Sequence, residues 1–494
     1  MLFPGYTYNT MKICFLRWNA RLVLVAFMVC MPFLSAQGQL PDIGDPASQI
    51  ITPEEEYRLG KKLLRDIRKK LPVVEDLELN YYINNLGYHL VSSSPDMRFP
   101  FTFLIIDDDQ INAFAMPGGV IAVNRGLIEL ADSEAELAAV LAHEIAHVTQ
   151  RHLARFFQQS KGVNLKTALG VLAAAILSSY SSQAGQAAFY GTLAANADSK
   201  LRFTRINERD ADRTGRVILA QAGYDTAAMQ SFFKKMEQAS LNNPDQVREF
   251  LQTHPLISTR ITDNIRPAQP PQGQKKIDSL DFQFAKFRLL GISGSMPTLL
   301  ARAKNLEKSQ RPQIQYLRAI SMLRNHQSRS AGKLLQAISS DQAQKLPIKL
   351  LEIRVLMAEK KHEQAVARAE ALYADHSQNP AVLGLLTEAR LQAGNPKSAL
   401  QLLKRTEISL ESWPQLLKLK AEAADQSGYP AQSHEALAEY YYYRGDIPLT
   451  LEHVKLALKT SGISSVMRAR LEQNKKDLED VISDKKIRSM DMDE

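Results

Sequence analysis

Two histidines four residues apart, His143 and His147, have the type and spacing to bind one metal ion. Apolar residues before and between them predict a helix, and side chains four apart on a helix project from the same face. Glu144 directly follows the first histidine, so its carboxylate can reach a water molecule on that metal without binding the metal itself. This pattern is typical of hydrolysis at one zinc ion (Zn²⁺) per chain, with Glu144 as the catalytic base.

A catalytic zinc site needs a third protein ligand and one open coordination position. Glu208 is the best candidate for that ligand, 61 residues beyond His147 in a segment of helical character. Asp212 follows one helical turn later and lies on the same face as Glu208. We therefore expect Asp212 to accept the free N–H of a ligand imidazole and so to fix the orientation of that ring.

The two motifs together resemble those of the gluzincin metallopeptidases, the family that contains the CAAX prenyl proteases and HtpX. The resemblance includes residues 112–114 (Asn-Ala-Phe) and the glycine-led strand at residues 119–124, and it extends over about residues 52–265. It implies a zinc endopeptidase with the ligands and the base named above. The chain lacks the well-defined membrane-spanning helices of HtpX, which favours a secreted member of the family.

His254 lies where this family has a recurrent histidine after the third ligand. The resemblance implies a catalytic role, in which His254 either donates to the oxyanion or closes the open zinc position in a resting state. An ordinary loop histidine is the alternative. Arg260 is a weaker candidate for the oxyanion role. We expect His152, five residues beyond His147, to lie on the surface.

Caps and apolar patterns predict the elements that must position these residues. A hydroxyl cap, a proline and a glutamate at residues 52–55 predict the start of a helix. Residues 101–106 and 120–123 are predicted to be neighbouring strands of a small sheet. One helix, from a cap at residue 133 to about residue 157, carries the histidine pair. We expect a substrate to lie extended along an edge strand at residues 119–123.

The C-terminal half carries an internal repeat. Ala331, Ala365 and Ala399 recur at steps of 34 residues, and Gly394 and Gly428 are also 34 residues apart. Small residues recur where two antiparallel helices must approach closely, and glycine recurs in the turn between them. This period resembles that of tetratricopeptide repeats, with an unrelated helical array as the alternative.

The first 36 residues are predicted to be a cleavable signal peptide. Basic residues precede 13 uncharged residues, 22–34, and a small-residue cleavage site follows. An uncleaved anchor helix is the alternative. Both cysteines lie in this segment, so the mature chain would hold no thiol, which suits an oxidising compartment. Cleavage would lower the net charge from +8 to +5, a bias too small for a nucleic-acid-binding protein.

A proline-rich linker at residues 266–276 is the clearest boundary in the chain. We predict a zinc metallopeptidase domain at residues 45–265, a tetratricopeptide-repeat-like domain at residues 277–480 and a charged tail at residues 481–494. Residues 167–197 hold no charged side chain. This segment is interpreted either as a lid near the active site or as a membrane or interfacial helix.

The expected fold is mainly α with a small β-sheet: a metallopeptidase domain followed by an α-helical repeat solenoid. The chain resembles secreted family members that carry such an array, and this resemblance implies a periplasmic endopeptidase that cleaves unfolded or misassembled polypeptides, outer-membrane proteins above all, by Glu-assisted attack of zinc-bound water. The repeats would dock clients or the outer-membrane assembly machinery, and peripheral membrane association is compatible with the sequence. The rival functions are a chaperone or scaffold with little proteolysis and a membrane-bound prenyl-protein protease.

Overall fold

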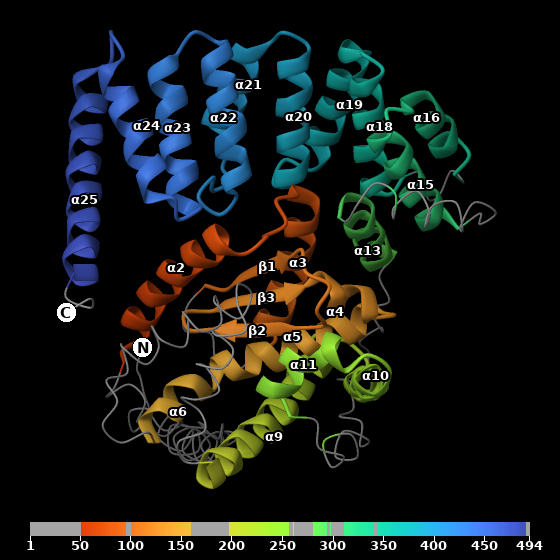
Figure 1. The fold of residues 1–494 in the computed structure, drawn as a ribbon. Helices are drawn as coiled ribbons and strands as arrows, with labels where there is room; N and C mark the ends of the chain where they lie inside the picture. The colour runs from red at the N-terminus through yellow and green to blue at the C-terminus, as the bar shows by residue number, and fades with distance from the viewer. Residues whose placement is uncertain are drawn as a thin grey trace, which may run out of the picture. The chain divides into compact units, whose positions relative to one another are not determined.

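The computed structural model describes residues 51–94, 100–159, 197–255, 260, 280–293, 297, 311–338 and 344–490. The predicted signal peptide, the proline-rich linker and all but the last residue of the uncharged segment 167–197 lie outside these residues. Residues 50–494 form one compact unit. Within it we distinguish the N-terminal region, residues 51–260, from the repeat region, residues 311–490 (Figure 1). No helix in the described part of the chain is both long enough and apolar enough to cross a membrane.

The sheet of the N-terminal region has three strands: β1 (Thr102–Ile106), β2 (Ala113–Met116) and β3 (Val120–Asn124). Their order is β1-β3-β2, with β3 parallel to β1 and antiparallel to β2. Gly118 and Gly119, at φ +75° and +79°, make the turn between β2 and β3, a backbone conformation that glycine adopts at little cost.

The expectation that residues 119–123 form an edge strand is wrong. The strand there, β3, is the central one and pairs on both sides. All five of its residues are buried, whereas a strand with one solvated face shows alternation of apolar and polar residues. In the described residues β2 pairs with β3 alone. The edge strand is therefore β2, which precedes the turn.

Nine described helices lie in the chain up to residue 292, together with this sheet. The first begins as predicted, because Thr52 and Glu55 form a reciprocal capping box. The helices are α2 (Pro53–Lys70), α3 (Leu77–Ser92), α4 (Arg125–Leu130), α5 (Glu134–Thr149), α6 (His152–Gln159), α9 (Ala197–Gln221), α10 (Ala227–Asn242), α11 (Pro244–Thr253) and α13 (Leu280–Ile292).

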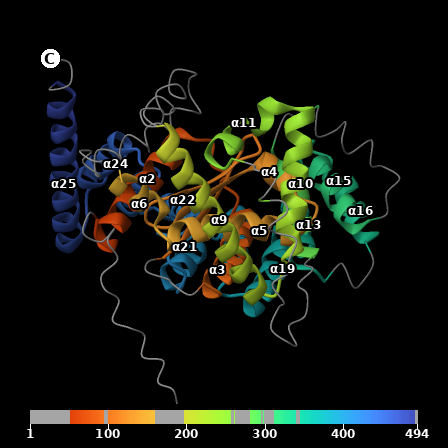
Figure 2. The ribbon, with the colours of Figure 1, turned by 90° about the horizontal axis from the view of Figure 1, so that it is seen from below.

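Helix α5 is the central helix of the N-terminal region. Most of its residues are buried, including the predicted core residues Leu137, Val140 and Leu141. Helix α9 packs alongside it (Figure 2). The prediction of one helix to about residue 157 is wrong, because Arg151 adopts a left-handed conformation at φ +52° that separates α5 from α6.

The repeat region is a row of helices in which each packs on its neighbours in sequence (Figure 1). The three alanines of the 34-residue repeat, Ala331, Ala365 and Ala399, are fully buried. Gly394 and Gly428 occupy turns with positive φ, as the repeat predicts. The helices are α15 (Pro312–Arg324), α16 (Ser328–Gln336), α18 (Leu346–Ala358), α19 (His362–Asp375), α20 (Pro380–Gln392), α21 (Pro396–Arg405), α22 (Pro414–Gln426), α23 (Pro430–Tyr443), α24 (Ile447–Lys459) and α25 (Ser465–Met490).

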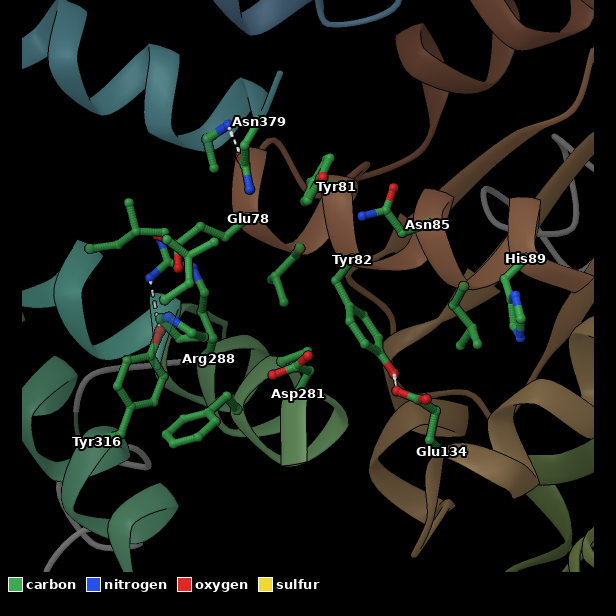
Figure 3. Close-up of a pocket in the computed structure, with 18 of the residues that line it drawn as sticks. Glu78, Tyr81, Tyr82, Asn85, His89, Glu134, Asp281, Arg288, Tyr316 and Asn379 are labelled. Carbon is green, nitrogen blue, oxygen red and sulfur yellow. Dashed lines mark hydrogen bonds and ion pairs between the residues drawn. The ribbon is translucent and has the colours of Figure 1, made fainter. Parts of the chain in front are cut away.

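Helices α3 and α13 contact each other and the repeat region, and buried ion pairs lie where they meet. Arg288 of α13 donates to both oxygens of Asp76, at 2.8 and 2.7 Å, and lies 3.1 Å from Glu78. Arg354 of the repeat region also pairs with Glu78. Beside these pairs lies a cavity of about 510 Å³, shown in Figure 3, with Arg288 and Tyr316 on one side and the hydrogen-bonded Tyr82 and Glu134 on another.

Candidate metal centre

Two packed helices, α5 and α9, supply most of the candidate site. Ser133 caps α5 by accepting a hydrogen bond from the backbone of Glu136. Gly215 of α9 lies against α5 so closely that an added Cβ would be 3.1 Å from the backbone nitrogen of His143. This glycine lets the two helices approach closely enough for side chains from both to meet.

Four side chains converge at this contact: His143, His147, Glu208 and His254. The Nε2 atom of His143 lies 3.1 Å from Nε2 of His147 and 3.3 Å from Nδ1 of His254. The carboxylate oxygens of Glu208 lie 3.1–3.4 Å from these three nitrogens. The structure therefore brings all three predicted metal ligands together, with His254 as a fourth member.

The spacing of these atoms fits a bound metal ion. Two ligand atoms held about 2.0–2.1 Å from a tetrahedral zinc ion lie roughly 3.3–3.4 Å from each other. The donor set of imidazole nitrogens and one carboxylate is the set that zinc takes in hydrolytic enzymes. Zinc is therefore compatible with both the identity and the separation of the donors.

Asp212 and Arg260 surround this group with charge. Asp212 Oδ1 lies 3.0 Å from Nδ1 of His143, an ion-pair distance without the alignment of a hydrogen bond. Arg260 is 1% exposed and donates to both Asp212 oxygens at 2.8 Å; its Nη1 also lies 2.8 Å from Glu208. The guanidinium is thus engaged with the two carboxylates, which indicates charge neutralisation rather than the oxyanion role considered above.

Both carboxyl groups are ionised in this setting. Burial alone would raise the pKa of Glu208, but the neighbouring His254 and the two other histidines lower it well below its ordinary value. Burial would likewise raise the pKa of Asp212, but hydrogen bonds from Arg260 and contact with His143 lower it. An ionised Glu208 is what a metal ligand requires.

Glu144 is 1% exposed and its Oε1 lies 3.5 Å from Nε2 of His254. With His147 it lines a cavity of about 200 Å³ that is also lined by β2, at Phe114 and Met116. The candidate base therefore lies beside the ligand group and beside the edge strand, where an extended peptide would have access to it.

The structure corrects the expectation that His152 lies on the surface. Its side chain is 4% exposed, and its Nδ1 lies 3.0 Å from Nδ1 of His147. Burial and the nearby His147 lower the pKa of His152 to about 2. The expectation assumed a continuous helix, and the left-handed Arg151 that separates α5 from α6 had no signal in the sequence, since arginine seldom adopts this conformation.

Comparisons with known proteins agree with this geometry. The model of peptidase family M48 matches residues 80–265, and a tetratricopeptide-repeat model matches residues 356–423. The chain is 32% identical over 444 residues to the "Beta-barrel assembly-enhancing protease" of Yersinia pestis, covering 88% of this chain and 91% of that one. It is also 32% identical over 466 residues to the protein of the same name from Escherichia coli strain K12, covering 92% and 95%.

A shorter similarity links this chain to mitochondrial enzymes. The "Mitochondrial metalloendopeptidase OMA1" of Schizosaccharomyces pombe is 30% identical over 180 residues, which is 36% of this chain and 50% of that protein. The predicted family and the predicted repeats are both confirmed, as is a mainly α fold with a small sheet. This chain belongs to peptidase family M48 and is a metalloendopeptidase with a C-terminal tetratricopeptide-repeat region.

Proposed function

We propose that this protein is a zinc-dependent endopeptidase of the periplasm that cleaves unfolded or misassembled polypeptides, outer-membrane proteins among them. The convergence of His143, His147 and Glu208 beside Glu144 carries the zinc-dependent part of the proposal. The names of the two bacterial relatives, which match along nearly the whole chain, support a role in β-barrel assembly. The predicted signal peptide supports the compartment.

His143, His147 and Glu208 would hold the ion, and Asp212 would orient His143 from the other side of its ring. Zinc bound there would supply an activated water molecule and polarise the peptide carbonyl. Glu144 would accept the proton of the water molecule and pass it to the leaving amine. Burial of Glu144 beside the ligand group supports this assignment, because it places the carboxylate within reach without making it a ligand.

The substrate chain would lie along β2 rather than along the strand predicted from the sequence. Residues 114–117 form one wall of the cavity that contains Glu144 and His147. An extended peptide paired with this edge would be held by main-chain hydrogen bonds. Such binding reads the backbone more than the side chains, so specificity would be broad and would favour polypeptides that can become extended.

His254 would close the site in its resting state. Its Nδ1 atom lies among the predicted ligand atoms, 3.3 Å from His143 and 3.1 Å from Glu208, and would serve there as a fourth protein ligand. A closed fourth position leaves no place for water, so His254 would have to move before hydrolysis. The alternative is that His254 donates to the oxyanion, which predicts the opposite effect of its removal.

The repeat region would dock clients or the outer-membrane assembly machinery. Superhelical arrays of this kind present extended surfaces for other proteins. The buried ion pairs of Asp76 and Glu78 with Arg288 tie α3, the helix that contacts the repeats, to α13. Because α3 and α13 both contact the repeat region, a client docked on the repeats would be held near the peptidase.

Three purified proteins test the proposal: wild type, Glu144→Gln and His254→Ala. Bound zinc is measured by mass spectrometry and cleavage is measured on unfolded casein. We expect all three to bind one zinc ion, Glu144→Gln to lose about 100-fold or more in rate, and His254→Ala to cleave faster than wild type. Unchanged cleavage by Glu144→Gln would refute the assignment of Glu144 as the catalytic base. A scaffold without proteolysis predicts instead that wild type does not cleave casein. Slower cleavage by His254→Ala would contradict the closing role of His254 and would favour its role as an oxyanion donor.

A further inference from the structure

His152 is a buried histidine that the mechanism above does not use. Its ring meets that of His147 edge to face, with centroids 4.9 Å apart and planes at 80°. The contact joins the Nδ1 atoms of the two rings at 3.0 Å. The other nitrogen of His147, Nε2, is the one that lies among the metal-ligand atoms. The two nitrogens of His147 thus have separate partners.

This division has a chemical consequence for the proton on His147. An imidazole that binds a metal through Nε2 is neutral and carries its proton on Nδ1, and that N–H needs an acceptor. Nδ1 of His152 is within hydrogen-bond distance and can accept if His152 carries its own proton on Nε2. In the described structure Nε2 of His152 is buried and has no hydrogen-bond partner, so no other contact competes for this tautomer.

The two histidines of the pair would then be oriented by different groups. His143 faces the carboxylate of Asp212 across its Nδ1, whereas His147 faces a neutral imidazole. Arg260 already neutralises Asp212 and Glu208. A neutral partner for His147 orients the second ring without adding a third buried negative charge that would need its own cation.

The backbone before His152 is built to hold it in this place. Arg151 has φ +52°, which residues other than glycine rarely adopt, and it lies between α5 and α6, directly before His152. The guanidinium of Arg151 is 3% exposed and donates to Glu56 at 3.0 Å and to the carbonyl of Ile51 at 2.7 Å. Unfavourable backbone conformations persist where surrounding contacts enforce them, often beside functional groups.

We propose that His152 is a positioning residue for the metal ligand His147. Its Nδ1 accepts the Nδ1 proton of His147 and holds that ring with Nε2 directed at the metal. The inference rests on the proposed function only in requiring that an ion binds between His143, His147 and Glu208. Arg151 and its contacts to residues 51 and 56 keep His152 in position.

The test measures the zinc dissociation constant of the purified full-length protein by competition with a chelator. His152→Asn and His152→Leu have nearly the same shape, but only asparagine offers an acceptor near the position of Nδ1. His152→Gln places its amide oxygen farther out. We expect His152→Leu and His152→Gln to bind zinc about 10- to 100-fold more weakly than wild type and His152→Asn to remain within a few-fold.

Two controls separate the outcomes. The urea midpoint of each metal-free variant reports folding, and Glu208→Gln reports whether the metal site itself is correct. Equal zinc affinity of the leucine and asparagine variants, whether both strong or both weak, overturns the role of His152. Wild-type zinc affinity of Glu208→Gln instead overturns the metal centre, because a ligand would then have been removed without effect.

Discussion

The helices around the metal centre and the helices of the repeat region pack by different means. Around the metal centre, buried charged and polar side chains that are far apart in sequence meet beside the apolar core of α5 and α9, as His143 does with Glu208 and Arg260 with Asp212. Helices α19 to α22 meet mainly through apolar side chains and fully buried alanines, each helix on its neighbours in sequence.

This difference predicts which substitutions destabilise each region most. Buried charges are stable only as complete sets, because the loss of one member leaves its partners unneutralised in a medium of low polarity. Alanine contacts depend on volume, so an error there is confined to one helix pair. Three substitutions test this contrast, and they are ordered by the size of the expected effect.

Removal of Arg260 should have the largest effect on stability. Arg260→Leu leaves the carboxylates of Asp212 and Glu208 buried without their cation, so we expect the free energy of unfolding of the metal-free protein to fall by about 3–5 kcal/mol. Urea unfolding measures the loss. The matched control is Arg213→Ala on α9, whose exposed pair with Asp210 should contribute less than about 1 kcal/mol. Equal effects of the two variants would contradict the contrast.

Overfilling one repeat should have a smaller and local effect. Ala365 is fully buried on α19, so Ala365→Leu should destabilise the protein by about 1–3 kcal/mol, with faster hydrogen exchange in α18 to α20. Ala371→Leu is the control, because this alanine lies exposed on the same helix and should change little. Faster exchange in α5 or α9 of the Ala365 variant would show that the two regions are coupled more strongly than the comparison implies.

At the junction between the regions, apolar contacts and buried ion pairs occur together. The stability of the buried pair between Asp76 and Arg288 should depend on pH. Burial alone would raise the pKa of Asp76, but Arg288 outweighs burial and lowers it from 3.8 to about 2. Because the folded pKa is the lower one, the pair stabilises the fold above about pH 4 and this stabilisation is lost as the pH falls through about 2. The shift corresponds to about 2 kcal/mol.

Asp76→Asn isolates this contribution, because asparagine can still cap α3 where Asp76 accepts from Leu79. We expect the variant to be less stable than wild type by at most about 2 kcal/mol at pH 7 and to match it near pH 2, as measured by urea unfolding across this range. Asp245→Asn, which alters an exposed pair, is the control and should show little difference at any pH. A constant deficit of Asp76→Asn at all pH values would exclude the ion pair as its cause.

Local patterns predicted much of this molecule. The capping box at Thr52, the helix that carries His143 and His147, and the 34-residue repeat depend on residues within one or two turns of each other or on a regular period, and the structure has each of them. Glu208 could be predicted from the sequence as the third ligand because Asp212 follows it by one helical turn.

The errors concern features that only tertiary structure determines. The order of the strands depends on which strand pairs on both sides, and the unbroken apolar run at residues 120–123, without alternation, was the available signal that β3 is central. The left-handed Arg151 depends on Glu56, 95 residues away, and it moves His152 from the surface to the metal centre. The neutralising role of Arg260 likewise depends on partners 48 and 52 residues distant.

In the described part of the chain β2 pairs on one side only, and under the proposed function this limits which polypeptides the enzyme would bind. A strand that recruits its ligand through the main chain needs a guest with unpaired backbone, whatever the guest's side chains. A completed β-barrel offers none, since closure joins its first strand to its last. A protease with this geometry would bind an incomplete barrel at its unpaired strand edge and would not cleave the closed barrel. This selection would need no sequence motif in the substrate.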